Sequence, residues 1–288
     1  MTAATITKSP HDLTITPRDR RFGRGTSQNR WWLGNDPIAT AFYNALSITF
    51  PRGEAFFVES VRAHREGTPP QLTAEINAFI KQEVIHSREH VSFNKRVVDA
   101  GYDISALEAA VTESLNLTKG RPVILNLAVT MALEHYTATL AQQLLANPAH
   151  LAGADPESAD LWRWHAIEEI EHKGVAYDTR LHATRDWSRW KRWKVKSLLM
   201  LVVTAKFWPR RLAGTKLLLA QDGISGGMTN LKILWFMLAQ PGMLTRIFPA
   251  WLAYFMPGFH PWNHDDRHLI KLVESDYRDA VLHEALAA

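Results

Sequence analysis

Two Glu-x-x-His motifs place the strongest constraint on how this chain can fold. Glu83 and His86 form the first motif, and Glu169 and His172 form the second, with His165 one turn earlier. Residues three or four apart share a face of an α-helix, so each motif presents a carboxylate beside an imidazole. Such groups are costly to bury among apolar side chains unless something binds them. The two motifs therefore predict two helices that face one polar site inside a core.

Two further carboxylates lie on apolar helical stripes. Glu54 shares its face with Phe50 and Val58, and Glu134 lies among apolar and small residues in ALEHYTATL. Glu54 precedes Glu83 by 29 residues, and Glu134 precedes Glu169 by 35. These separations suit two antiparallel helical hairpins, and the 51 residues between Glu83 and Glu134 leave room for a longer crossover.

Two Glu-x-x-His helices and two single-Glu helices together are typical of a dinuclear metal site in a four-helix bundle. Four carboxylates neutralise most of the charge of two metal ions and can bridge them, and an imidazole completes each site. We expect two metal ions: iron and manganese suit these ligands equally, and zinc is not excluded. His90 and Glu168 are expected to orient ligands through hydrogen bonds. For His90, a core histidine bonded to a carbonyl is the alternative.

Gly and Pro residues divide the chain into long helical segments. The expected helices cover about 36–65, 73–100, 105–117, 121–147 and 155–184, and no alternating run predicts a strand. The predicted fold class is therefore all-α, a four-helix bundle with extra C-terminal helices. We divide the chain into an N-terminal arm (1–35), a metal-binding bundle (36–184) and a helical cap rich in Trp, Lys and Arg (185–288).

Composition excludes several function classes. The 288 residues include no cysteine, which rules out disulfides, thiolate chemistry and Cys-ligated zinc or iron–sulfur sites. The net charge is +4, and ten Lys or Arg residues fall between Arg185 and Lys216. No nucleic-acid-binding motif accompanies them, so we expect no nucleic-acid partner. The N-terminus lacks the apolar core of a signal peptide, and we expect a cytoplasmic protein.

The C-terminal region contains the apolar stretches LLMLVVTA, ILWFMLA and IFPAWLAYFM. Each is shorter than the roughly 18 residues of a spanning helix, so we expect no transmembrane segment. Two compatible interpretations remain: a cap packed on the bundle, or peripheral membrane contact through 185–256. The stretch FHPWNHDDRH (259–268) is interpreted as the start of a last helix, capped by Asn263 or Asp265, rather than as another metal site.

The order Glu, Glu-x-x-His, Glu, Glu-x-x-His resembles that of the ferritin-like di-iron carboxylate superfamily. The form His165-x-x-x-Glu169-x-x-His172 is similar to the p-aminobenzoate N-oxygenase branch, in which an extra histidine joins the site. The resemblance implies a ferritin-like bundle and these ligands: Glu54, Glu83, His86, Glu134, His165, Glu169 and His172. The chain also resembles the bacterial family of predicted metal-dependent hydrolases, through FPRGEAFF, ALEHYTA, WHAIEEIEHKGVAYD and GFHPWNHDD.

The leading functional hypothesis is a di-iron enzyme that activates O₂ and oxidises an organic substrate, such as a lipophilic or acyl compound. An external electron donor would then be required. The alternative is a dinuclear metal-dependent hydrolase, in which two metals activate water. Iron storage and a membrane-surface module with a structural metal are the non-enzymatic alternatives. The C-terminal third has no counterpart in the N-oxygenases, so their substrate is not carried over, and a homodimer is an assembly that the sequence allows.

Overall fold

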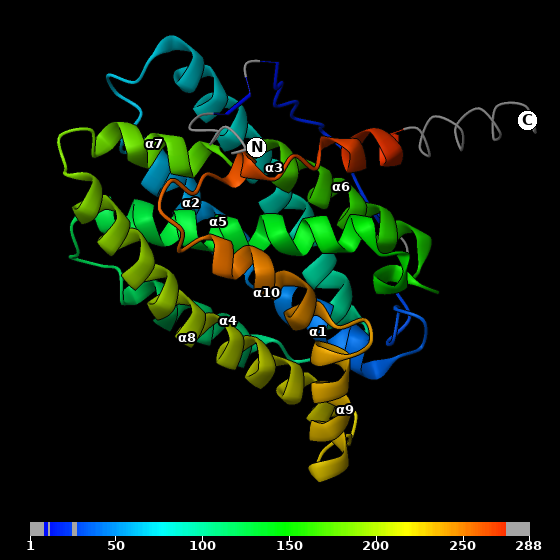
Figure 1. Cartoon of the computed structure of the whole chain (residues 1–288). Helices are drawn as coiled ribbons and strands as arrows, with labels where there is room; N and C mark the ends of the chain where they lie inside the picture. Colours follow the sequence, from blue (N-terminus) through cyan, green and yellow to red (C-terminus); the bar gives the residue numbers. More distant parts are fainter. Residues whose placement is uncertain (1–8, 11, 25–27, 275–288) are drawn as a thin grey trace, which may run out of the picture.

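The computed structural model describes residues 9–10, 12–24 and 28–274, and it is all-α (Figure 1). Within these residues the one extended pairing is a β-bridge between Leu33 and Ala154. The predicted all-α fold and helical bundle are confirmed. The helices are α1 (Pro37–Ser47), α2 (Phe50–Arg62), α3 (Pro70–Asp99), α4 (Ser105–Asn116), α5 (Val123–Ala146), α6 (Pro156–His172), α7 (Val175–Ala183), α8 (Arg189–Gln221), α9 (Gly227–Leu238) and α10 (Met243–Ala253), with short 3₁₀ turns at Pro148–Leu151 and Pro261–Asn263.

Four helices form the part of the bundle that carries the predicted ligands. Helix α2 packs on α3, and α5 packs on α6. Contacts of α2 with α5 and of α3 with α6 close the ring. Each of the four helices can therefore direct side chains into one shared interior.

The segment predicted as one helix over 36–65 is two helices, α1 and α2, which meet at Ile48 and Thr49. Pro51 lies in the first turn of α2 and has no N–H with which to continue the hydrogen-bond ladder of α1. The carbonyl of Ser47, four residues earlier, instead accepts a 3.3 Å hydrogen bond from the side-chain amide of Asn94. The carbonyl that Pro51 leaves without a helical partner therefore forms a hydrogen bond between α1 and α3.

The segment predicted as one helix over 155–184 is also broken, between α6 and α7, at Lys173 and Gly174. A Cβ atom on Gly174 would lie 2.5 Å from Ser9 Oγ and 2.8 Å from Trp262 Nε1. The N-terminal arm and the C-terminal segment therefore approach the backbone here too closely for any side chain. The helical periodicity of a sequence does not reveal such long-range contacts, so it could not predict this break.

The arm and the C-terminal helices both pack on the bundle. Backbone N–H groups of Thr16, Arg18 and Phe22 donate to buried carboxylates of α3 and α6. Helix α8 packs on α1 and α5, and α10 packs on α5 and α9. Buried apolar side chains from α1 through α10 belong to one continuous core. The proposed division into arm, bundle and cap stays a prediction.

Helix α5 is long and apolar enough by composition to cross a membrane, with a mean hydropathy of 1.2 over its most apolar window. It is the one described helix with this property. However, much of that window is buried inside the protein, and Glu134 lies on its buried face. We therefore interpret α5 as a core helix of the bundle.

Candidate metal centre

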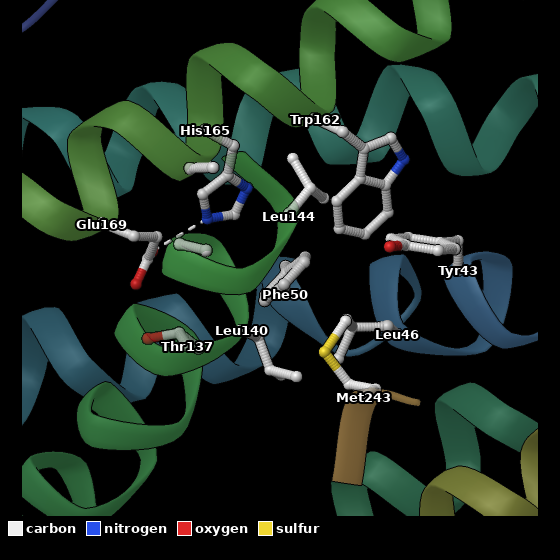
Figure 2. Close-up of a pocket in the computed structure, with 12 residues that line it drawn as sticks. Tyr43, Leu46, Phe50, Thr137, Leu140, Leu144, Trp162, His165, Glu169 and Met243 are labelled. Carbon is white, nitrogen blue, oxygen red and sulfur yellow. Dashed lines mark hydrogen bonds and ion pairs between the residues drawn. The ribbon is translucent and has the colours of Figure 1, made fainter. Parts of the chain in front are cut away.

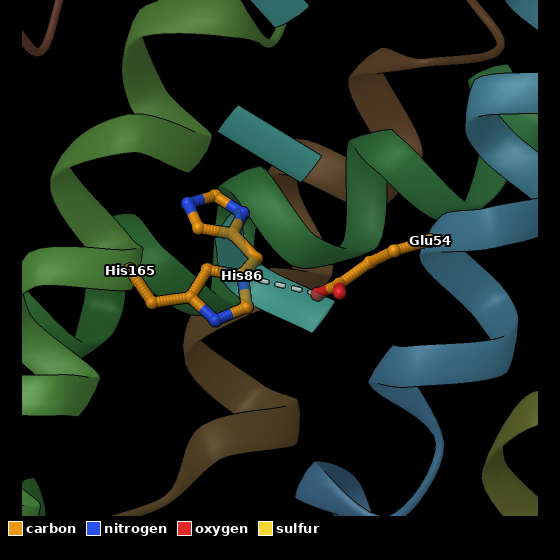
Figure 3. A group of neighbouring side chains, drawn as sticks. All are labelled: Glu54, His86 and His165. Carbon is orange, nitrogen blue, oxygen red and sulfur yellow. Dashed lines mark ion pairs between the residues drawn. The ribbon is translucent and has the colours of Figure 1, made fainter. Parts of the chain in front are cut away.

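The seven predicted ligands lie together in the interior of the bundle. All are at most 5% exposed, and they come from α2, α3, α5 and α6. Glu54, His86 and His165 form one group whose potential ligand atoms lie within 4.8 Å of one another, and Figure 3 shows their side chains converging. Glu83, Glu169 and His172 form a second group of the same kind. We call these groups site A and site B.

Glu169 lies between the two sites and faces both. Its Oε1 atom is 2.8 Å from His165 Nε2 and 3.9 Å from His86 Nδ1, both in site A. Its Oε2 atom is 3.6 Å from His172 Nε2, in site B. A carboxylate that offers one oxygen to each site has the placement of a bridging ligand between two metal ions.

Glu134 joins site B. Its Oε2 atom is 3.4 Å from His172 Nε2, and Glu83 Oε1 is 3.3 Å from the same nitrogen. On the other side, Glu54 Oε1 is 3.8 Å from His165 Nε2. Site A thus has one carboxylate and two histidines of its own, and site B has two carboxylates and one histidine. Glu169 faces both sites.

Most of the donor atoms that face the interior lack hydrogen-bond partners in the protein, although His165 Nε2 and Glu169 Oε1 are paired with each other. Buried polar atoms in folded proteins are almost always hydrogen-bonded, so a cluster of unpaired atoms requires an explanation. Among the described residues, the unpaired buried atoms include Glu54 Oε1, Glu83 Oε1 and Oε2, His86 Nδ1, Glu134 Oε1 and Oε2, Glu169 Oε2 and His172 Nε2. These oxygens and nitrogens are hard and borderline donors that suit iron, manganese or zinc. The residues therefore fit a pair of metal ions.

Electrostatics support the same conclusion. Burial raises the pKa of Glu54, Glu83 and Glu134 well above the usual range, and neighbouring carboxylates raise each further. Burial also acts to raise the pKa of Glu169, but the neighbouring His172 and His165 outweigh it and hold that pKa well below its usual range. Four carboxylates confined in one dry interior repel one another, and two divalent cations would balance their charge.

His86 is oriented by a hydrogen bond to Glu168, which in turn accepts a hydrogen bond from Arg18. His86 Nε2 lies 3.0 Å from Glu168 Oε2, and the backbone N–H of Arg18 donates to Glu168 Oε1 at 2.8 Å. Burial holds the pKa of His86 well below its usual range, so the ring is neutral. A neutral ring that donates from Nε2 to a carboxylate keeps the lone pair of Nδ1 directed at site A.

His165 is oriented by His90 through a chain of polar contacts. Its Nδ1 atom lies 2.6 Å from His90 Nε2, and His90 Nδ1 lies 2.8 Å from Ser47 Oγ. Ser47 donates its only proton to Asn94 Oδ1 at 2.7 Å, so His90 Nδ1 must donate to Ser47. His90 Nε2 then accepts from His165 Nδ1–H, and His165 Nε2 points into site A, 2.8 Å from Glu169 Oε1.

His172 is oriented by a residue that the sequence did not single out. Gln82 Oε1 lies 3.0 Å from His172 Nδ1, and the Gln82 amide donates to Glu171 Oε2 at 2.9 Å. Glu171 lies on α6, is only 4% exposed and pairs with Arg18 at 2.7 Å. The one feature of the sequence that could have drawn attention to Gln82 is its position directly before the predicted ligand Glu83 on α3.

A small cavity adjoins the centre on the side of Glu169 and His165 (Figure 2). Its volume is about 30 Å³, enough for a molecule the size of water. The other side chains that line it are mostly apolar, among them Leu140, Leu144 and Trp162. The candidate centre therefore has room for one small molecule beside Glu169.

The FHPWNHDDRH stretch makes protein contacts. His260 Nε2 lies 3.0 Å from Asp178 Oδ1, and Asp266 forms a buried ion pair with Lys173. Asp265 accepts from the backbone N–H of Arg267, where a helix begins. The groups of described residues arranged to hold a metal ion are sites A and B. A helix begins at Arg267, as the interpretation of this stretch as a helix start expects, but the residue directly before it is Asp266 rather than Asn263 or Asp265.

Comparison with known proteins gives one match. The model of a family described as "predicted metal-dependent hydrolase" matches residues 16–265. No curated protein and no solved structure matches the chain. The matched segment includes all seven residues of the candidate centre and most of the C-terminal helices.

Proposed function

The chain belongs to the family of predicted metal-dependent hydrolases, and from this membership and the geometry above we propose that it is a dinuclear metal enzyme. The observation that carries the proposal is the position of Glu169 between two groups of buried, unpaired donor atoms. A Glu from each of two helices with Glu-x-x-His from each of two others is the donor set of di-iron and di-manganese carboxylate bundles. We therefore propose iron as the metal and the ferritin-like superfamily as the structural class of the bundle.

The favoured reaction class is oxidation of an organic substrate by O₂, with an external electron donor. A reduced iron pair in such a centre supplies the electrons and open positions that O₂ activation requires. The protein's own residues would act around it: Glu168, His90 and Gln82 hold the three imidazoles in one tautomer and orientation. Burial of the ligands excludes bulk water from the reacting region.

Hydrolysis is the second candidate, and the description of the family favours it. Two metals a few ångströms apart can activate water and stabilise the developing oxyanion of an ester, amide or phosphoester. Zinc or manganese would serve this chemistry as well as iron. The same residues would hold the metals in either case, so the two candidates differ in metal and reaction, not in site.

The deciding experiment measures metal content first and reactivity second. We expect about two metal ions per chain by elemental analysis, and in Glu169→Ala loss of at least one of them, because both sites share this carboxylate. The exposed Glu59 of α2 supplies the control Glu59→Ala, which should retain both. A wild-type chain that binds no metal under these conditions would overturn the proposal.

Reactivity then separates the two candidates. The anaerobic Fe(II)-loaded protein is mixed with O₂ in a stopped-flow spectrometer, and consumption of O₂ is followed with an electrode. Consumption that is lost in Glu169→Ala supports oxidation. An iron form inert to O₂, together with hydrolysis of model esters or phosphoesters by the zinc or manganese form, would establish the hydrolase instead.

A further inference from the structure

A larger cavity reaches the metal centre from the side of α2, α4, α5 and α8. Its volume is about 580 Å³, within the roughly 300–1,000 Å³ of small-molecule sites. Most of its wall is apolar, with Phe50, Leu115 and Val203 among the lining side chains. Glu54 of site A also lines it, although this residue is only 1% exposed. A molecule that fills the cavity therefore lies against a carboxylate of the metal centre.

Gly53 keeps the cavity open beside Glu54. It lies within helix α2, where glycine is less favourable than alanine by about 1 kcal/mol. A Cβ atom at this position would meet nothing within 4 Å, and its backbone is not in the left-handed region. Neither a close contact nor backbone conformation therefore requires glycine here. The missing side chain instead adds space to the cavity next to the metal centre.

Cationic side chains that reach solvent also line the same cavity. Arg121 and Lys206 are exposed, Arg210 is half-buried, and all three line the cavity. None of them pairs with a carboxylate of the described residues, and Glu54, at the closed end, is the one described acid in the wall. The cavity thus has an unneutralised positive rim, an apolar wall and a metal centre at its inner end.

We propose that this cavity binds a single-chain amphiphile, with its anionic head group at Lys206 and Arg210 and its aliphatic chain extending to Glu54. The apolar wall recognises the chain by burying it, and the unpaired cations recognise the head group. This inference rests on the proposed function, since it makes the buried chain the part of the substrate that the metals meet. Carboxylate and phosphate head groups share the required charge, and the experiment below separates them.

The first test compares amphiphiles that differ only in the head group. Dodecanoate and dodecyl phosphate, each below its critical micelle concentration, and dodecanol, below its solubility limit, are used to displace a fluorescent fatty acid from the metal-loaded protein. We expect at least one of the anions to bind tenfold or more tightly than dodecanol, and the preferred anion identifies the head group. In Lys206→Gln/Arg210→Gln this preference should disappear, while dodecanol affinity stays unchanged. Equal affinity for all three compounds in the wild-type protein would overturn the proposed head-group contact.

The second test fills the cavity. Gly53→Leu should weaken binding of the preferred anion at least tenfold, because the new side chain occupies the space beside Glu54. Gly227→Leu is the matched control, since a Cβ there also meets nothing within 4 Å and Gly227 lies outside the cavity. Metal content is measured in both variants and should equal that of the wild type. Unchanged affinity in Gly53→Leu would show that the chain does not lie in this cavity.

The outcomes also separate this inference from the function on which it rests. A wild-type protein that takes up two metals but binds none of the amphiphiles would refute the cavity assignment and leave the dinuclear centre standing. Amphiphile binding by a protein that takes up no metal would refute the dinuclear centre instead.

Discussion

At the scale of single residues, the centre depends on the side chains behind the ligands. Glu168 touches no expected metal position, yet it fixes the ring of His86 through a 3.0 Å contact. His90 and Gln82 do the same for His165 and His172. Each imidazole is therefore held with one ring nitrogen directed at the sites before any metal binds, which lowers the cost of ordering the site on binding.

Glu168→Ala should weaken metal binding by roughly 10–100-fold, because His86 loses the acceptor that fixes its tautomer. The measurement is competition with a chromophoric chelator at fixed pH. Glu59→Ala, on the exposed face of α2, should bind metal as the wild type does. Equal affinity in Glu168→Ala would mean that the contact seen at Glu168 does not position the ligand.

Metal binding should release protons. Burial raises the pKa of Glu54, Glu83 and Glu134, so without metal these groups keep their protons to higher pH than free carboxyl groups do, and a metal ion must displace those protons. The apparent affinity should therefore rise with pH and fall as the solution becomes acidic. Calorimetry in buffers of different ionisation enthalpy should count about one to three protons released per chain. A binding enthalpy that does not depend on the buffer would contradict these raised pKa values.

At the scale of elements, the sequence predicted the bundle and the ligand-bearing faces well. Helical periodicity places Glu83 beside His86 and Glu169 beside His172 whatever the tertiary structure, and the structure brings all seven candidate residues together. Their roles as metal ligands remain a prediction. Periodicity gives the direction of a side chain but not what packs there. For that reason the partly buried ion pair of Glu171 with Arg18 was missed.

The helix breaks were missed for a related reason. Pro51 was visible in the sequence, but a proline in a first turn and one that interrupts a longer helix look alike without tertiary context. The break at Gly174 depends on Ser9 and Trp262, which are distant in the sequence. Contacts of this kind follow from the assembled fold and not from local pattern.

Gly174→Ala should destabilise the protein by about 1–3 kcal/mol, because the new methyl group overlaps Ser9 and Trp262 at the junction of α6 and α7. The free energy of unfolding is measured by urea denaturation of the metal-free protein. Gly53→Ala is the control: its methyl group meets open space within a helix, so we expect stabilisation of up to about 1 kcal/mol. Similar effects of the two substitutions would show that the junction does not require glycine.

At the scale of the whole molecule, apolar side chains are exposed along the C-terminal helices. Exposed Lys232 and Arg246 lie among them. A surface with apolar and basic residues together is typical of peripheral membrane contact. We propose that this surface rests on anionic lipid, which would place the cavity near its amphiphilic substrate. The exposed apolar residues are Trp190, Leu198, Leu201, Val202, Leu217, Met228, Leu231, Leu234, Trp235, Leu238, Phe248, Leu252 and Met256.

Flotation with phosphatidylglycerol vesicles tests this surface. The wild type should float with the vesicles, and Leu234→Ser/Trp235→Ser should float at least several-fold less, because α9 loses exposed apolar area. Val84→Ser/Val91→Ser removes similarly exposed side chains from α3 and should leave flotation unchanged. If the wild type remains with the soluble fraction, or if both double variants behave alike, the surface has another use.

The arm that carries Arg18 has a consequence for how the protein is made. Arg18 leaves the ribosome well before α6, which supplies its partners Glu168 and Glu171, and before Glu274, which pairs with the same guanidinium at 2.8 Å. The hydrogen-bond network behind His86 and His172 can therefore close only after α6 has left the ribosome. Until then the nascent chain would remain metal-free.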